Sequence, residues 1–90
     1  MGKIMNPAKR KDYYQIESLQ GHILVMSSAG YFILATLDNE WHSVNCDISR
    51  TQEIKDLVGK TVLIEVKQLL DIDTDKPTKI ILEGKIKVIS

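Results

Sequence analysis

The sequence predicts a small, mainly β domain of five strands, with one short helix between the third and fourth strands. A chain of 90 residues suits a single hydrophobic core, because chains divide into separate domains only at several times this length. Turn signals divide most of the chain into segments of strand length. Only one segment, residues 49–59, places its apolar side chains at helical spacing.

Composition places the chain among globular proteins and excludes several other classes. Hydrophobic residues make up 43% and charged residues 27%, close to the globular average. No apolar run approaches the ~20 residues of a membrane-spanning helix, and no apolar signal-peptide segment follows the basic N-terminal residues. The single cysteine, Cys46, allows no internal disulfide. We therefore expect an intracellular protein of the cytoplasm or nucleus, without a membrane partner.

The first twelve residues are expected to form a flexible basic arm. Residues 1–12 contain a glycine, a proline and a basic cluster that includes Arg10 and Lys11, and they show no apolar periodicity. The folded domain is therefore expected over residues 13–90.

Three antiparallel strands are expected in the first half of the domain, at residues 14–26, 31–37 and 40–48. Gly21 interrupts the first strand and predicts a bend there. The small polar residues 27–30 supply the first turn. Asp38 and Asn39 supply the second, since both residue types tolerate the positive φ of tight hairpins.

Alternation in the third strand separates a core face from an outer face. Val44, Cys46 and Ile48 share one parity and are expected in the core. Trp41, the only tryptophan, has the opposite parity and polar neighbours. Something should cover an outward indole: a ligand stacked on it, the N-terminal arm, or the curvature of the barrel itself.

A helix and a final hairpin complete the domain. Ser49 is the expected N-cap, with a glutamine three residues later, and Gly59 supplies the left-handed stop after an apolar stripe. This pattern predicts a helix of about two to three turns. Residues 61–70 and 79–89 then alternate apolar and polar side chains around a polar loop, which predicts an antiparallel hairpin.

Three segments carry a resemblance to a known family: residues 19–23 (LQGHI), 57–62 (LVGKTV) and 79–89 (KIILEGKIKVI). In this order, and with one helix between the third and fourth strands, the chain resembles the OB-fold superfamily over about residues 14–90. The nearest kinds are small single-strand-binding proteins and small subunits of replication or telomere complexes. The resemblance implies a five-stranded Greek-key barrel. A small SH3-like barrel is the alternative fold.

The resemblance implies a non-enzymatic module that binds single-stranded nucleic acid, DNA or RNA, within a larger complex. Exposed aromatic rings stack on bases in such modules, and basic side chains contact phosphates. The residues expected in these roles are Tyr31, Phe32 and Trp41 for bases and Lys67, Lys85, Lys87, Arg10 and Lys11 for phosphates.

The charge balance favours an alternative function. Twelve basic and twelve acidic residues give a formal net charge of zero, so the chain lacks the positive field that drives nucleic-acid binding. Several strands also carry apolar residues on both parities, which predicts a residual apolar face for a protein partner or a second copy. The alternative is thus a protein-interaction OB subunit that assembles a nucleic-acid-processing complex without binding nucleic acid. Oligosaccharide binding, which also uses exposed aromatics, is a third possibility.

No motif predicts catalysis, a metal or a cofactor. Asp71, Asp73 and Asp75 begin like a calcium loop, but Lys76 and Leu82 stand where that motif needs glycine and glutamate. The two histidines and the single cysteine are too few for a zinc site, and no oriented catalytic base is recognisable. We therefore expect a protein that is not an enzyme.

Overall fold

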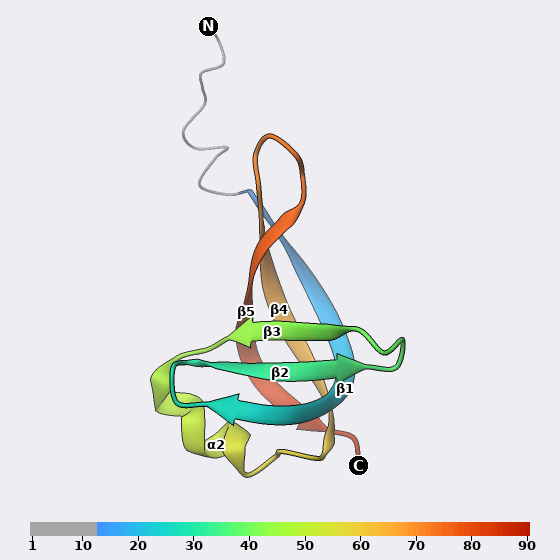
Figure 1. Ribbon diagram of the computed structural model, residues 1–90, viewed down its shortest axis with the longest axis vertical. Coiled ribbons are helices and arrows are strands. Elements are labelled where there is room, and N and C mark those ends of the chain that lie inside the picture. The colour runs from blue at the N-terminus through green and yellow to red at the C-terminus, as the bar shows by residue number, and fades with distance from the viewer. Residues whose placement is uncertain (1–12) are drawn as a thin grey trace, which may run out of the picture.

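The computed structural model describes residues 13–90, and the expectations for the arm, Arg10 and Lys11 lie outside them. Five strands close into a barrel, and a short helical segment lies at one end of it (Figure 1). The strands are β1 (Tyr14–Ser27), β2 (Tyr31–Thr36), β3 (Trp41–Asn45), β4 (Thr61–Leu70) and β5 (Pro77–Val88). The helical segment is a 3-10 turn, η1 (Ile48–Arg50), followed by α2 (Thr51–Lys55).

The barrel closes in the order β1-β2-β3-β5-β4, with β4 returning to β1. Every pair is antiparallel except β3 with β5, where Val44 and Asn45 lie beside Ile80 and Ile81 in parallel. The predicted fold class is confirmed: the protein is a closed, five-stranded, OB-like barrel with its one helical segment between β3 and β4.

The long first strand takes part in both halves of the barrel. Its early residues pair with β4 and its later residues with β2, and Gly21 pairs on both sides, with Thr36 and Val62. β1 curves through this region and then runs across the front of the molecule (Figure 1). The register shifts just beyond, between Ile23 and Val25, which marks a bulge.

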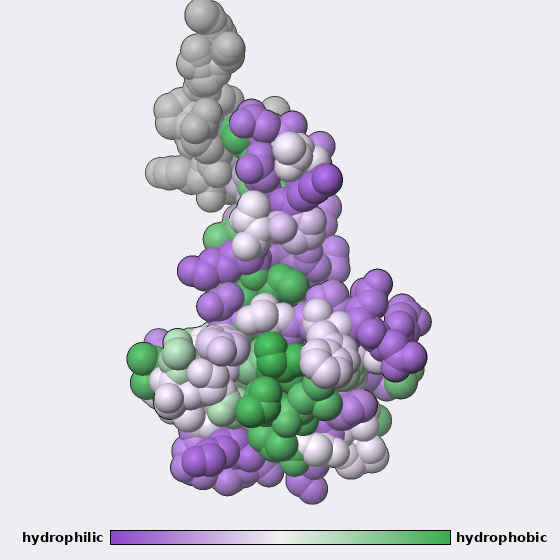
Figure 2. Space-filling view, viewed as in Figure 1, coloured by the Kyte–Doolittle hydropathy of each residue, from purple (hydrophilic) through white to green (hydrophobic). Residues whose placement is uncertain are grey.

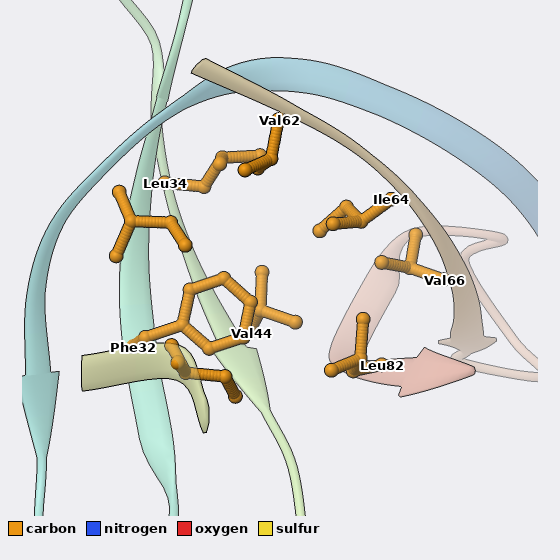
Figure 3. Packing of buried hydrophobic residues seen from close by; sticks show 9 residues of the cluster. Phe32, Leu34, Val44, Val62, Ile64, Val66 and Leu82 are labelled. Carbon is orange, nitrogen blue, oxygen red and sulfur yellow. The ribbon is translucent and has the colours of Figure 1, made fainter. Parts of the chain in front are cut away.

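The core fills the inside of the barrel from all five strands and the helix. Phe32 and Val44 pack side by side within it, and Val66 and Leu82 line the opposite wall (Figure 3). The fully buried members are Ile23, Phe32, Leu34, Val44, Ile54, Val62, Ile64 and Val66. The alternation expected in residues 61–70 is confirmed, since the inward side chains of β4 are those of one parity.

Two expectations for the end of the third strand are wrong. β3 ends at Asn45, and Ile48 is 68% exposed in η1 instead of buried, while Cys46 is half-buried against the core. The cause is a cap: the Asp47 side chain accepts a hydrogen bond from the Ser49 N–H at 2.9 Å, so the chain turns helical before the alternation can continue. The helix is also shorter than the sequence suggested, since α2 has only five residues.

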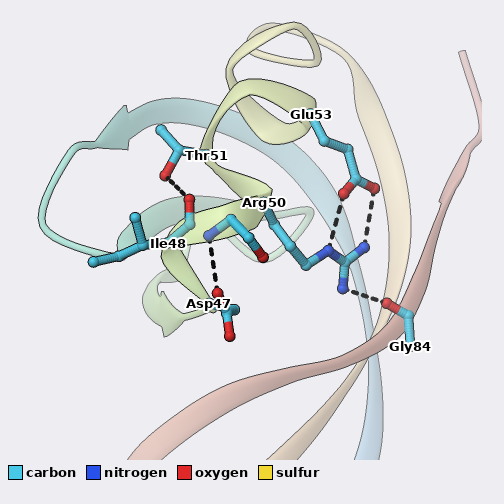
Figure 4. A network of polar contacts seen from close by, with 7 residues as sticks. Asp47, Ile48, Arg50, Thr51, Glu53 and Gly84 are labelled. Atoms are coloured by element: carbon cyan, nitrogen blue, oxygen red, sulfur yellow. Dashed lines mark hydrogen bonds and ion pairs between the residues drawn. The ribbon is translucent and has the colours of Figure 1, made fainter.

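Arg50 ties this helical segment to β5. Its guanidinium donates to both carboxylate oxygens of Glu53, each at 2.9 Å, and also to the carbonyl oxygen of Gly84 (Figure 4). The hydrogen bonds from Arg50 hold the pKa of the Glu53 carboxyl below its ordinary value. Together these three hydrogen bonds join the helical segment to β5, so Arg50 has a structural role.

Candidate functional site

The outer face of β1, β2 and β3 carries the exposed apolar and aromatic side chains. Strand register aligns Val25, Ile33 and Ser43 in one row across the three strands. Tyr31 and Asn45 lie opposite each other in the adjoining row. Side chains two apart on a strand share a face, so these residues form one continuous outer surface.

Trp41 stands at one end of this surface and Tyr31 at the other. Trp41 is 72% exposed at the start of β3, opposite Ala35, which confirms that the indole faces outward. Tyr31 is 38% exposed at the start of β2. The distance along β2 from Tyr31 to Ala35 is roughly 13 Å at the usual rise per residue. Ile33 lies between them, so two aromatic rings flank an apolar floor.

Apolar surface gathers over the front of β2 and the second half of β1, beside the hydrophilic β2–β3 turn (Figure 2). Val25 contributes to the exposed part, at 51%. The barrel interior is already filled by the core, so this patch lies outside it and is available to a ligand or a partner.

A shallow hollow of about 260 Å³ extends the face from β3 onto the start of β5. It is lined by Ser43, Asn45, Pro77, Thr78, Lys79 and Ile80. The Asn45 amide donates to the Ile80 carbonyl at 3.2 Å and joins the two strands at this point. Because Val44 is opposite Ile80, the parallel register places Lys79 next to Ser43. Hydroxyl groups, an amide and an ammonium therefore border the aromatic face.

The expectation that Phe32 stacks on a base is wrong. Phe32 has no exposed surface and packs in the centre of the core, so it cannot stack on a base. Tyr31 and Phe32 point to opposite faces of β2, and only the tyrosine is on the outside.

The three lysines expected near phosphates are not neighbours of Tyr31 or Trp41 in the strand register. Lys67 pairs with Ile81, which in turn pairs with Asn45, so Lys67 lies two strands away from β3. Lys67 projects from β4, with its Nζ 4.6 Å from the centroid of the Tyr14 ring. Lys85 and Lys87 come after Gly84, whose φ is positive, and lie in the part of β5 that pairs with the beginning of β4. β3 pairs with β5 only near residues 80–81.

Among the described residues, Lys79 lies beside the aromatic face, and it was not among the expected phosphate contacts. Its position follows from the parallel pairing of β3 with β5. Local alternation cannot reveal that pairing, because the two strands are far apart in the sequence.

Acidic residues occupy two turns of the chain, one before Trp41 and one before Pro77. Asp38 and Glu40 precede Trp41 in the β2–β3 turn, and three aspartates lie in the β4–β5 loop. Residues 13–90 carry eight basic and eleven acidic side chains, while residues 1–12 carry four basic and one acidic. The described barrel is therefore net negative, and its aromatic face must bind any anion through local contacts.

The aspartates of the β4–β5 loop and the thiol of Cys46 were considered above for metal or thiol chemistry. The Asp71 carboxylate accepts hydrogen bonds from the backbone N–H groups of Asp73 and Thr74, at 2.7 and 3.2 Å, which closes the loop. Burial raises the pKa of the Cys46 thiol. Within residues 13–90, no three His, Cys, Asp or Glu side chains are grouped to hold a metal ion.

No protein-family model, curated protein or solved structure matches the chain. No helix in the described part is both long and apolar enough to cross a membrane.

Proposed function

We propose that the protein is an OB-fold module that binds single-stranded nucleic acid across the outer face of β2 and β3. The supporting observation is the pair of exposed rings, Tyr31 and Trp41, at opposite ends of the apolar floor around Ile33. A single strand crossing this face has a base-stacking surface at each end, and stacking is worth about 1–3 kcal/mol per base.

The border of the face suits the backbone of such a strand. Lys79 supplies one cation, and Ser43 supplies a hydroxyl donor in the adjoining hollow. The net negative barrel limits the number of phosphate contacts, so stacking provides most of the affinity. Since each phosphate contact adds about −0.7 to the slope of log K against log salt concentration, we expect a shallow salt dependence.

Trp41 fluorescence tests this proposal directly. Unlabelled oligo(dT) and oligo(U) are titrated into the full chain at low salt and again at high salt. Quenching that saturates supports the proposal, and comparison of the two oligonucleotides distinguishes DNA from RNA preference. No quenching at low salt would refute it.

Two tyrosines give a matched pair of variants, because Tyr31 and Tyr14 are both 38% exposed. Tyr31→Leu removes a stacking ring from the proposed face and should weaken oligonucleotide binding by roughly tenfold, equivalent to about 1.4 kcal/mol. Tyr14→Leu alters a ring beside Lys67 on a different part of the barrel and should leave the affinity unchanged. Equal effects of the two substitutions would argue against this face.

A protein-binding role for the same barrel is the second candidate. It is favoured by the excess of acidic residues in the barrel and by the exposed apolar surface around Val25 and Ile33. In that case Val25→Glu abolishes assembly with the partner or with a second copy, whereas oligonucleotides leave Trp41 fluorescence unchanged. Light scattering measures the mass of the chain before and after the substitution.

A further inference from the structure

The first half of β1 has a free edge. Residues 14–20 pair with β4 on one side, but β2 meets β1 only from Gly21 onward. Within residues 13–90, no other strand pairs with the opposite side of residues 14–20. This half of β1 is therefore a free strand edge within the barrel.

The backbone groups on this edge are those of the even-numbered residues. The Leu70 N–H donates to the Tyr13 carbonyl at 3.3 Å, so the odd-numbered residues of β1 are the ones bonded to β4. The even-numbered residues turn their N–H and C=O groups to the free side. They are Tyr14, Ile16 and Ser18, which lie before the point where β2 joins β1 at residues 20–21.

A hollow of about 400 Å³ lies along part of this edge. It is lined by residues 17–20 of β1, by the β2–β3 turn with Asp38 and Glu40, and by Gln68 of β4. Gln68 is only 8% exposed, and its amide donates to the Glu17 carboxylate at 2.7 Å. The space next to residues 17–20, where β2 no longer pairs with β1, is thus open to a further segment of chain.

The carboxylates that line the hollow give it a negative charge. Glu17, Asp38 and Glu40 line it, and among residues 13–90 no lysine or arginine does. His42 also lines the hollow, with its Nε2 3.6 Å from the Glu40 carboxylate. This lining repels phosphates and attracts ammonium and guanidinium groups, so the hollow does not continue the proposed nucleic-acid face.

We infer that this edge takes up a basic, extended segment of a partner protein, which adds to β1 as a further strand. Backbone hydrogen bonds to the even-numbered residues of β1 provide affinity, and the acidic lining selects lysine and arginine. Residues 14–20 contain no proline or lysine, two of the common protections of exposed edges against added strands. The inference is independent of what binds at Trp41.

Synthetic peptides test the inference with the full chain. The probe is a capped peptide of alternating lysine and valine, about seven residues long to match residues 14–20. One control replaces each lysine with glutamate, and another methylates alternate backbone nitrogens while keeping every side chain. Calorimetry measures affinity, and amide NMR shifts locate the site.

We expect the basic peptide to shift the amides of residues 14–20 and both controls to bind at least roughly tenfold more weakly. Equal binding of the glutamate peptide would overturn the charge argument. Equal binding of the methylated peptide would overturn strand addition. Edge-to-edge dimerisation of the chain without peptide would assign the edge to a second copy and overturn the inference as well.

Variants of the chain separate the two sources of affinity. Ser18→Pro removes an N–H that faces the free side while leaving the ladder of odd-numbered residues intact. Asp38→Lys reverses a charge in the hollow, and Asp73→Lys makes the same change in the exposed β4–β5 loop as a control. Ser18→Pro and Asp38→Lys should each weaken peptide binding roughly tenfold, whereas Asp73→Lys should leave it unchanged.

If Ser18→Pro disturbs folding, Asp38→Lys alone still decides the charge argument, and an unchanged affinity in that variant contradicts it. Neither substitution alters Tyr31 or Trp41, so oligonucleotide quenching of Trp41 serves as a separate readout. A failure of strand addition is thereby distinguishable from a failure of the proposed nucleic-acid binding.

Discussion

The backbone of Gly21 lies directly against the carbonyl group of Ala35, and a Cβ built at position 21 would overlap the Ala35 oxygen. No real Cβ tolerates such an overlap, so the close approach of β1 and β2 depends on the absence of a side chain. At the same residue β1 also pairs with Val62 of β4. Gly21 is therefore what lets one strand belong to both halves of the barrel.

Gly21→Ala should destabilise the protein by about 3 kcal/mol or more, because the obstructing atoms are backbone and cannot rotate away. Gly59→Ala is the control: Gly59 has a φ of 91° but no atom within 4 Å of a built Cβ, so only its left-handed backbone is strained. That strain costs about 1–2 kcal/mol. Urea unfolding of both variants measures the difference, and a Gly21 variant no less stable than the Gly59 variant would contradict this account.

Substitution of Phe32 and Tyr31 should have opposite consequences although the residues are adjacent. Phe32→Ala removes a fully buried ring and should cost about 3–5 kcal/mol of folding free energy. Tyr31→Ala truncates an exposed ring and should cost less than about 1 kcal/mol while weakening oligonucleotide binding. Thermal unfolding and Trp41 titration, applied to both variants, check the two effects. A large loss of stability in Tyr31→Ala would mean that its ring is part of the core.

The Arg50–Glu53 pair should make stability depend on acid pH. Its hydrogen bonds lower the pKa of Glu53 from 4.5 in the folded protein, so the unfolded chain takes up the proton first as pH falls. The stabilisation is therefore present above about pH 4.5 and is lost as the pH falls through the lowered pKa. Because 46% of the Glu53 side chain is exposed, we expect less than about 1 kcal/mol.

Glu53→Gln should then be less stable than the natural sequence at pH 7 and nearly equal to it at pH 3, as measured by urea unfolding. Glu65→Gln is a suitable control, since Glu65 forms no ion pair among the described residues. A stability gap that stays constant between the two pH values would rule out the ion pair as its cause.

Alternation along the sequence was sufficient to predict the strands, because inward positions such as Val62, Ile64 and Val66 repeat with the period of a strand. Their arrangement as a barrel came from the resemblance to the OB-fold superfamily. It failed at Ile48, where the local cap formed by Asp47 ended the extended backbone first. A side chain that satisfies backbone N–H groups thus overrides the hydrophobic pattern within one or two residues.

The candidate site was less predictable than the fold. Alternation shows that Tyr31 and Phe32 face opposite ways, but not which of them faces inward. Alternation likewise predicts that Lys87 faces outward, but it does not show which strands lie next to Lys87 around the barrel. Both questions depend on pairing between distant segments, such as Asn45 with Ile81, which no local pattern encodes.

The thiol of Cys46 should react slowly in the folded protein. Burial against the core raises its pKa above the ordinary value of 9.0, so a smaller fraction is thiolate at any pH below that. The thiolate is the reactive form, and partial burial also restricts access to it. Alkylation by iodoacetamide at pH 8 should therefore be several-fold slower for the folded chain than for the chain in urea.

The pH dependence of the Cys46 reaction separates these two causes. A raised pKa moves the midpoint of the rate profile to a pH above that of the unfolded chain, whereas restricted access lowers the rate equally at every pH. Arg50 opposes the shift, because its positive charge favours the thiolate. Arg50→Gln should consequently move the midpoint further upward, and a downward movement would contradict a favourable interaction between the Arg50 charge and the thiolate.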